Sequence, residues 1–226
     1  MTSPLARRAY RSLAQLVLIM GALIFVAAGT LAYWQAWVFV ILYGLVSLAI
    51  TVDLVDRDPA LLERRLTGGP WAEKEPAQKI IMAIATLGLL GLLVVPGLDH
   101  RFGWSHVPAA AAMIGEALTL LGWWVIFHVF RANTYTAAIV EVAPDHRVVS
   151  LGPYAVVRHP MYAGGLVMLA GVPVALGSWW GVAVMALIVP MIVWRVIEEE
   201  GFLIENLPGY DDYCDEVRWR LLPGVW

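Results

Sequence analysis

The chain has 226 residues, of which 60% are hydrophobic and 15% are charged. A typical soluble domain is about half apolar and a quarter charged, so this composition argues against a soluble globular enzyme and against a disordered chain. The net charge of −3 gives no support for nucleic-acid binding. The single cysteine, Cys214, excludes an intramolecular disulfide framework and a cysteine-rich zinc site, and we predict no metal site.

Long uncharged stretches predict an all-α, polytopic membrane protein with about six transmembrane helices. One span needs about 20 apolar residues, so the longest stretches must each contain two helices joined by a turn. We place the first turn near residues 33–37 and the second near residues 177–181, where Gly, Ser and Trp cluster. The predicted spans lie within residues 12–52 (two helices), 80–98, 108–130 and 159–194 (two helices).

The distribution of Lys and Arg predicts the orientation of these spans. With six spans, both termini lie on one side of the membrane. Of the 15 Lys and Arg residues, 14 fall on that side and only Arg101 falls on the other. The positive-inside rule therefore predicts cytoplasmic N and C termini. The first apolar run is too long for a cleaved signal peptide. We expect an integral protein of the bacterial cytoplasmic membrane whose site faces the cytoplasm.

Residues 152–165, at the start of the fifth span, are suited to binding a small molecule. Pro160 favours the first turn of a helix, which places His159 at the N-cap. The N–H groups of that turn and the positive end of the helix dipole favour an anionic group such as a carboxylate. Tyr162 adds a ring face and a hydroxyl group. Taken singly, each of these residues could equally have a structural role.

A second cluster follows the sixth predicted span and contains Arg195 and the acidic residues 198–200. Arg195 and Glu199 are four residues apart and share a helix face. We expect this acidic run to lie at a helix C-terminus, where negative charges interact unfavourably with the helix dipole. The unfavourable position suggests that these residues have a role other than stabilising the helix. The tight turn between spans five and six should bring this cluster beside His159. Such a site could hold a zwitterionic cofactor and leave an arginine for an anionic substrate group.

These residues resemble the isoprenylcysteine carboxyl methyltransferase family. The resemblance extends from about Asn133 to the C-terminus and rests on three motifs: Gly152-Pro153-Tyr154-x3-Arg158-His159-Pro160-x-Tyr162-x-Gly164, Arg195-x3-Glu199-Glu200-x2-Leu203, and Tyr210-x2-Tyr213. The family consists of integral membrane enzymes that use S-adenosyl-L-methionine without a Rossmann domain. The resemblance implies an N-terminal four-helix membrane region at residues 1–130 and a cofactor-binding region at residues 131–226.

The resemblance also implies roles for individual residues. Arg195 would lie at the substrate and is the predicted catalytic residue. The predicted cofactor-binding residues come from an upstream loop, the Arg-His-Pro segment and the first glutamate of the pair: His146, Arg147, Val148, Val149, Tyr154, His159, Pro160, Met161, Tyr162 and Glu199.

The implied reaction is methyl transfer to a lipophilic or prenylated acceptor in the bilayer, on the carboxylate or thiol of an isoprenylcysteine-like substrate. A phospholipid amine or a small thiol remains open as the acceptor, and no nucleic-acid partner is expected. NADPH-dependent membrane sterol reductases compete, because residues 218–226 resemble their C-terminal sequence. Those enzymes carry R-H-x-x-Y-x-G-D and R-D-E-x-x-C, whereas this chain has Gly165 and residues 198–200 at the diagnostic positions. We therefore favour the methyltransferase.

Two features of the apolar spans each allow two interpretations. Glu116 would be costly facing lipid, and we interpret it as a helix–helix hydrogen-bonding residue rather than a functional one. Gly164, Gly165 and Gly171 share one face or edge of the fifth span. They would either open a lateral gap for an apolar acceptor or let helices pack closely.

Overall fold

The computed structural model describes residues 3–67, 76–136 and 147–226. The regular secondary structure in these ranges is helical, which confirms the predicted all-α fold. The elements are α1 (Pro4–Ala28), α2 (Trp34–Arg57), α3 (Pro59–Leu66), α4 (Pro76–Phe102), α5 (Ala109–Ala132), the short 3-10 helix η1 (Gly152–Ala155), α6 (Pro160–Ala175), α7 (Trp179–Asn206) and α8 (Tyr210–Glu216).

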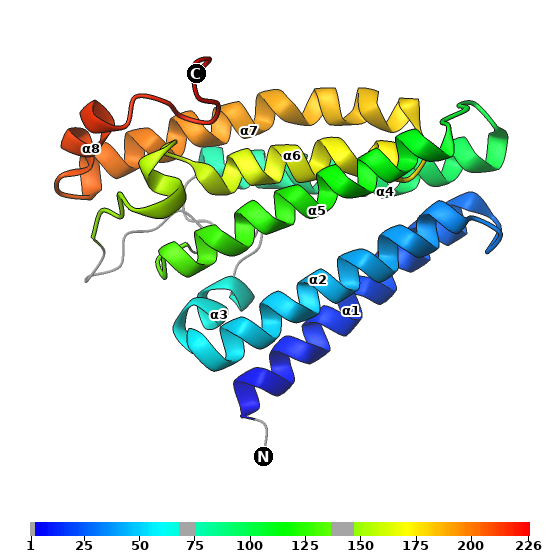
Figure 1. Cartoon of the computed structure of the whole chain (residues 1–226), viewed down its shortest axis with the longest axis horizontal. Helices are drawn as coiled ribbons and strands as arrows, with labels where there is room; N and C mark the ends of the chain where they lie inside the picture. The colour runs from blue at the N-terminus through cyan, green and yellow to red at the C-terminus, as the bar shows by residue number, and fades with distance from the viewer. Residues whose placement is uncertain (1–2, 68–75, 137–146) are drawn as a thin grey trace.

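The long helices run back and forth along one axis (Figure 1). The three short connections, at residues 29–33, 103–108 and 176–178, meet at one end of the bundle, which we call the turn end. The short helices α3 and α8 lie at the other end, which we call the site end. Helices α4 to α7 pack together, α1 packs along α4, and α2 contacts α5.

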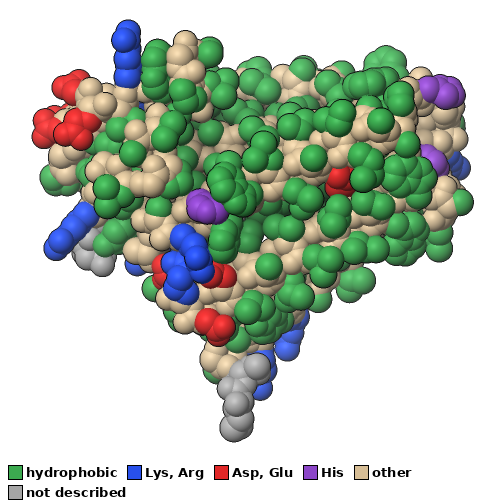
Figure 2. All heavy atoms as spheres, in the orientation of Figure 1, with side chains coloured by type: hydrophobic (Ala, Val, Ile, Leu, Met, Phe, Trp, Pro, Cys, Tyr) green, Lys and Arg blue, Asp and Glu red, His purple; other side chains and the backbone are tan. Residues whose placement is uncertain are grey.

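Helices α1, α2, α4, α5 and α7 are long and apolar enough to cross a membrane. Hydrophobic side chains cover most of the face in Figure 2, and the charged groups visible there gather mainly toward the ends. The predicted polytopic membrane protein is therefore confirmed. Helix α6 has 16 residues, so it is about 24 Å long, which is less than the ~30 Å hydrocarbon core of a bilayer. Its partner α7 has 28 residues, or about 42 Å.

The difference in length corrects one expectation about the acidic cluster. Residues 198–200 do not end the helix, because α7 continues to Asn206. Arg195 and Glu199 are therefore inside a regular helix that extends past the N-terminus of α6. The predicted conflict between the acidic run and the C-terminal end of the helix dipole was wrong, because that end lies more than one turn further along the chain.

Glycines hold α5 and α6 close together. A Cβ atom on Gly171 would lie 2.5 Å from the carbonyl oxygen of Gly115, and one on Gly164 would lie 3.0 Å from the Val125 side chain. Gly122 likewise faces the α6 backbone. Small residues that let backbones approach are typical of helix contacts in membranes. Close packing is therefore the correct interpretation for Gly164 and Gly171, whereas Gly165 faces open space among the described atoms.

Glu116 lies on α5 and is 5% exposed. Its Oε1 atom has no hydrogen-bond partner within the part of the chain that the structure describes. The helix–helix hydrogen bond that we predicted is thus not present at this oxygen.

A buried polar cluster closes the turn end. Asp99 of α4 is 1% exposed, and its Oδ1 accepts a hydrogen bond from the Ser105 amide at 2.7 Å. Its Oδ2 accepts from the hydroxyl groups of Ser105 at 2.7 Å and Ser178 at 2.5 Å. The Ser178 hydroxyl also accepts from the Gly181 amide and so caps α7. These bonds fix the turn of the α6–α7 hairpin and, through it, the register of the two helices.

Candidate functional site

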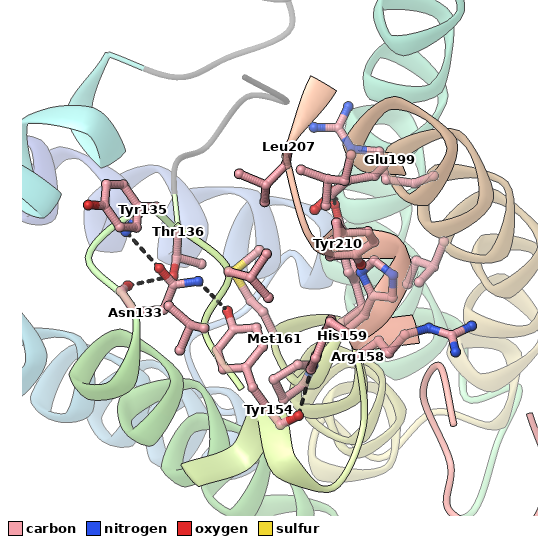
Figure 3. Close-up of a pocket in the computed structure, with 18 of the residues that line it drawn as sticks. Asn133, Tyr135, Thr136, Tyr154, Arg158, His159, Met161, Glu199, Leu207 and Tyr210 are labelled. Atoms are coloured by element: carbon pink, nitrogen blue, oxygen red, sulfur yellow. Dashed lines mark hydrogen bonds between the residues drawn. The ribbon is translucent and has the colours of Figure 1, made fainter. Parts of the chain in front are cut away.

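A pocket of about 360 Å³ lies at the site end of the bundle (Figure 3). It collects residues from α3, α4, α6, α7 and α8, from η1 and from the segment that follows α5. Every predicted site residue that the structure describes lines this pocket: Arg147, Val148, Val149, Tyr154, His159, Pro160, Met161, Tyr162, Arg195 and Glu199. The remaining predicted residue, His146, is outside the described residues.

The first turn of α6 contributes to the pocket. Pro160 occupies the first helical position and His159 is the N-cap, as predicted. The N–H groups of a first helical turn have no partner inside the helix, and the N–H groups of Met161 and Tyr162 belong to this turn. The pocket wall therefore includes the positive end of a helix, which favours an anionic ligand group.

Tyr162 connects this turn to the two predicted functional residues on α7. Its hydroxyl group donates a hydrogen bond to Glu199 Oε2 at 2.5 Å. The same hydroxyl oxygen accepts a hydrogen bond from Arg195 Nε at 3.2 Å. The hairpin thus brings together the two sequence motifs, which are more than 30 residues apart. Among the described residues that line the pocket, Glu199 is the one carboxylate.

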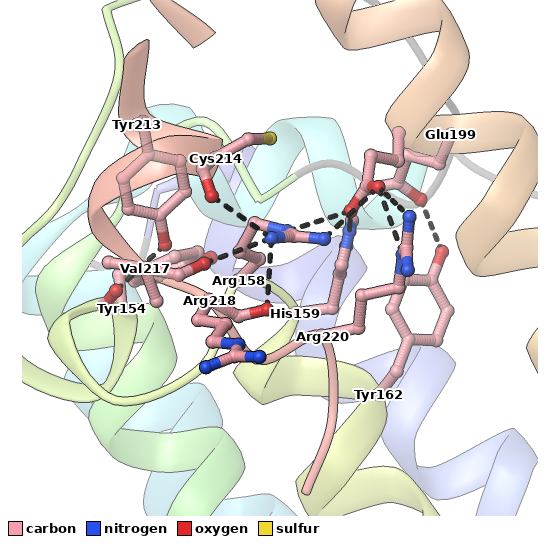
Figure 4. A network of polar contacts seen from close by, with 11 residues as sticks. Tyr154, Arg158, His159, Tyr162, Glu199, Tyr213, Cys214, Val217, Arg218 and Arg220 are labelled. Atoms are coloured by element: carbon pink, nitrogen blue, oxygen red, sulfur yellow. Dashed lines mark hydrogen bonds and ion pairs between the residues drawn. The ribbon is translucent and has the colours of Figure 1, made fainter. Parts of the chain in front are cut away.

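The neighbouring residue Glu200 belongs to a different network, whose partners Arg158, His159 and Arg220 are labelled in Figure 4. Its carboxylate pairs with Arg158 at 2.9 Å and with Arg220 at 2.7 Å, and its Oε2 lies 3.3 Å from His159 Nε2. The side chains of Arg158 and Glu200 are each 7% exposed. Arg158 Nη1 also donates to three carbonyl oxygens of the C-terminal segment, those of Cys214, Val217 and Arg218. This network joins α7, α6 and the C-terminal segment behind the pocket.

Backbone hydrogen bonds also join the segment before α6 to the C-terminal segment. The N–H groups of Arg158 and His159 donate to the carbonyl oxygens of Trp219 and Arg220, at 2.8 and 2.9 Å. The C-terminal segment therefore holds the segment before α6 through hydrogen bonds to its side chains and to its backbone. This explains how the first turn of a short helix is kept in a fixed orientation toward the pocket.

Tyrosines form another wall. The Tyr154 hydroxyl accepts from Asn133 Nδ2 at 3.1 Å, and its carbonyl oxygen accepts from the Tyr213 hydroxyl at 2.7 Å. Tyr210 packs with Tyr213 in the same apolar cluster. Burial raises the pKa of each of these three tyrosines. Their hydroxyl groups therefore remain neutral at physiological pH and present polar atoms beside ring faces.

The pocket also has an apolar side between α4 and α7. Its lining there comes from Ile81, Met82 and Ala85 of α4 and from Met191 and Ile192 of α7. Further toward the turn end the two helices close up, since a Cβ atom on Gly88 would lie 2.7 Å from the Ile188 side chain. The apolar part of the pocket is therefore next to helices that face lipid.

Sequence reasoning missed three contributors to the site. Glu200 was indistinguishable from its neighbours, because only the packing shows that it faces Arg158. Asn133 precedes the recognised motifs, and its role depends on a contact with Tyr154. Arg65 of α3 lines the pocket from the N-terminal half of the chain, where no sequence signal marked it.

Comparisons with known proteins concern the family and the fold of this chain. Residues 110–208 match the model of the family described as Phospholipid methyltransferase. A solved structure of the eukaryotic intramembrane Ras methyltransferase, isoprenylcysteine carboxyl methyltransferase, has the same fold, with a TM-score of 0.54. The alignment covers 99% of this chain and 98% of that one, at 16% sequence identity. No curated protein sequence matches this chain.

These findings support the resemblance to an isoprenylcysteine carboxyl methyltransferase-like membrane methyltransferase that the motifs indicated. The family model matches residues 110–208, and the solved structure shows that the fold is shared. The matching family is described as a phospholipid methyltransferase, whereas the solved structure is that of a Ras methyltransferase.

Proposed function

We propose that this protein transfers the methyl group of S-adenosyl-L-methionine to a lipophilic acceptor that reaches the site from the bilayer. One observation carries the proposal. The first turn of α6 and the Glu199–Tyr162–Arg195 chain share one pocket that also has an apolar side between α4 and α7. Such a pocket offers separate places for a charged cofactor and an apolar acceptor.

The described residues fit the cofactor by charge and by size. The first-turn N–H groups of α6 suit its carboxylate. The Glu199 carboxylate suits its ammonium group or ribose hydroxyls, and the tyrosine wall suits its aromatic base. The volume of about 360 Å³ lies within the roughly 300–1,000 Å³ typical of small-molecule sites. When bound, the cofactor supplies a methyl group on a positively charged sulfur.

The chain itself contributes positioning rather than acid–base chemistry. An acceptor lone pair forms the new bond to the methyl carbon, and the electrons of the broken carbon–sulfur bond remain on sulfur. A carboxylate acceptor already has the lone pair that it needs, whereas a thiol or an ammonium acceptor must first lose a proton to water. Arg195 orients an oxyanion by paired hydrogen bonds, and holding the reactants in line supplies much of the catalysis.

The site is proposed to face the cytoplasm. The topology places α3, α8 and the pocket at one end of the bundle, and 14 of the 15 Lys and Arg residues belong to segments assigned to that side. The positive-inside rule then puts this end in the cytoplasm of a bacterium, where the cofactor is made.

Calorimetry on the protein in lipid nanodiscs tests the proposal. We expect saturable binding of S-adenosyl-L-methionine and of its demethylated product, S-adenosylhomocysteine, and no saturable binding of NADPH. Binding of NADPH without binding of either S-adenosyl compound would assign the chain to the sterol reductases instead.

A further inference from the structure

Helix α3 presents two consecutive arginines to the site end of the bundle. Asp58 caps this helix by accepting a hydrogen bond from the Leu61 amide at 3.0 Å, and Pro59 starts it. Arg64 Nη1 donates to the carbonyl oxygen of Thr134 at 2.7 Å. The first arginine thereby attaches α3 to the segment that follows α5, which fixes the direction of the second.

Arg65, the second arginine, lines the pocket. Its guanidinium carbon lies 5.0 Å from the ring centroid of Phe130. Its Nη1 lies 3.7 Å from the sulfur of Met161, in the first turn of α6. The group is also close enough to Tyr162 to interact with it electrostatically. The Arg65 guanidinium group therefore lies between Phe130 of α5 and the first turn of α6.

Two arginines thus flank Tyr162. Arg195 contacts its hydroxyl group from α7, next to Glu199, and Arg65 lies beside the preceding residue, Met161. Glu199 and Arg195 are assigned above to the cofactor and the reacting group. A second planar guanidinium in the same pocket matches a second oxyanion, because its paired N–H groups fit carboxylate and phosphate oxygens.

We propose that Arg65 binds a second oxyanion of the lipophilic acceptor, a phosphate or a carboxylate other than the reacting group, and that α3 thereby selects the acceptor. This inference rests on the proposed methyl transfer and deepens it by naming the chemistry of the acceptor. Helix α3 is outside residues 110–208, which match the family model. The N-terminal part of the chain accordingly does more than anchor the protein in the membrane, because α3 brings Arg65 into the pocket.

The test compares Arg65→Met with wild type. Methionine keeps an unbranched apolar stem against Phe130 and Met161 but removes the guanidinium group. Arg8→Met is the matched control, because Arg8 also contacts α3, donating to the Leu66 carbonyl oxygen at 3.4 Å, yet does not line the pocket. Arg65→Lys retains the charge without the planar fork and should behave as an intermediate variant.

The probes are three amphiphiles of equal chain length: tetradecyl phosphate, tetradecanoate and tetradecanol. Their binding to nanodisc protein loaded with S-adenosylhomocysteine is measured by calorimetry, with empty nanodiscs subtracted. We expect at least one oxyanion to bind wild type more tightly than tetradecanol. We expect Arg65→Met to weaken that oxyanion about tenfold, a typical loss for a hydrogen bond to a charged group. Tetradecanol binding, S-adenosylhomocysteine binding and thermal stability should not change.

The oxyanion that responds identifies the group that Arg65 binds, phosphate for a phospholipid-like acceptor and carboxylate for an acceptor with a second carboxylate. Equal oxyanion binding by wild type and Arg65→Met overturns the inference, and so does wild-type binding with no preference over tetradecanol. A loss confined to S-adenosylhomocysteine would move Arg65 to the cofactor. These outcomes are separate from failure of the proposed function, which would appear as wild-type protein that binds neither S-adenosyl compound.

Discussion

Each end of the α6–α7 hairpin has a buried carboxylate that joins segments, and the site end has a second carboxylate that faces the pocket. At the turn end, both Asp99 oxygens accept hydrogen bonds from Ser105 or Ser178, and the side chain serves only to join segments. At the site end, the same task falls to Glu200, which is enclosed by Arg158, His159 and Arg220. The residue before it, Glu199, turns instead toward the pocket.

This difference shows how a site can be kept open in a closely packed bundle. Successive residues on a helix point about 100° apart, so α7 can send one glutamate into a structural network and the next one into a cavity. The structural glutamate fixes the helix, and the other can then be positioned for a ligand. The turn end has no such pair of carboxylates, since both Asp99 oxygens accept hydrogen bonds from Ser105 or Ser178.

The largest expected effect is on stability and comes from Glu200→Gln. Removing this charge leaves the guanidinium of Arg158 buried without its carboxylate, and breaking a buried ion pair costs about 3–5 kcal/mol. Denaturation in mixed SDS micelles, followed by circular dichroism, measures the loss. Glu198→Gln is the control, because Glu198 is exposed and its one side-chain bond within the described residues comes from Trp194 at 3.1 Å. Equal stability of the two variants would contradict the structural role of Glu200.

The next largest effect is on catalysis and comes from Arg195→Lys. An ammonium group cannot reproduce the paired hydrogen bonds of a guanidinium. We expect the rate of methyl transfer at saturating cofactor to fall about a hundredfold, which corresponds to about 2.7 kcal/mol of transition-state stabilisation. The affinity for S-adenosylhomocysteine should stay close to wild type. Loss of cofactor affinity with normal turnover would reverse the roles assigned to Arg195 and Glu199.

A smaller effect on binding is expected for Glu199→Gln, the counterpart of the Glu200 variant. The amide oxygen can still accept the hydrogen bond from Tyr162, so stability should change little. The lost charge should weaken S-adenosylhomocysteine binding about tenfold, as for other hydrogen bonds to charged groups. Calorimetry and SDS denaturation on the same preparation separate the two quantities. A loss of stability as large as that of Glu200→Gln would remove the distinction between the two glutamates.

The smallest effect is expected at the turn end, for Asp99→Asn. The amide oxygen can still accept from the Ser105 N–H, and the amide nitrogen can donate to the serine hydroxyls after these rotate. We expect a loss of about 1 kcal/mol in stability. The affinity for S-adenosylhomocysteine should not change, because the substitution is at the opposite end of the bundle. A shift in that affinity would show that the two ends are coupled.

The sequence predicted the spans well because charge and turn residues mark their ends. The boundary expected for the fourth span, residues 108–130, differs from that of α5 by two residues or fewer. The turn expected at residues 177–181 overlaps the Ser178 cap of α7. The pocket residues on α6 and α7 were also found, because Pro160 fixed a helix start and the four-residue spacing of Arg195 and Glu199 fixed a helix face.

Other features depend on tertiary contacts that no local pattern encodes. A charged residue ends an apolar run but does not end a helix, so the continuation of α7 to Asn206 was not predicted. Helix α3 lies between the predicted spans, where the sequence predicted no element, and the position of Arg65 depends on its contacts with Phe130 and Met161. The glycines of α6 allowed two interpretations, and the position of α5 decided between them for Gly164 and Gly171.

The short length of α6 gives the surrounding bilayer a part in the reaction. A helix of about 24 Å does not reach across a hydrocarbon core of about 30 Å, whereas its neighbours α5 and α7 do. If the turn end is held at one interface by its aromatic residues, the whole deficit falls beside the pocket. The first turn of α6 would then lie below the headgroups, and the depth that an acceptor's polar head must enter to reach Arg65 and Arg195 increases with bilayer thickness. We therefore expect methyl transfer to be faster in bilayers with shorter acyl chains than in thick, sterol-rich bilayers.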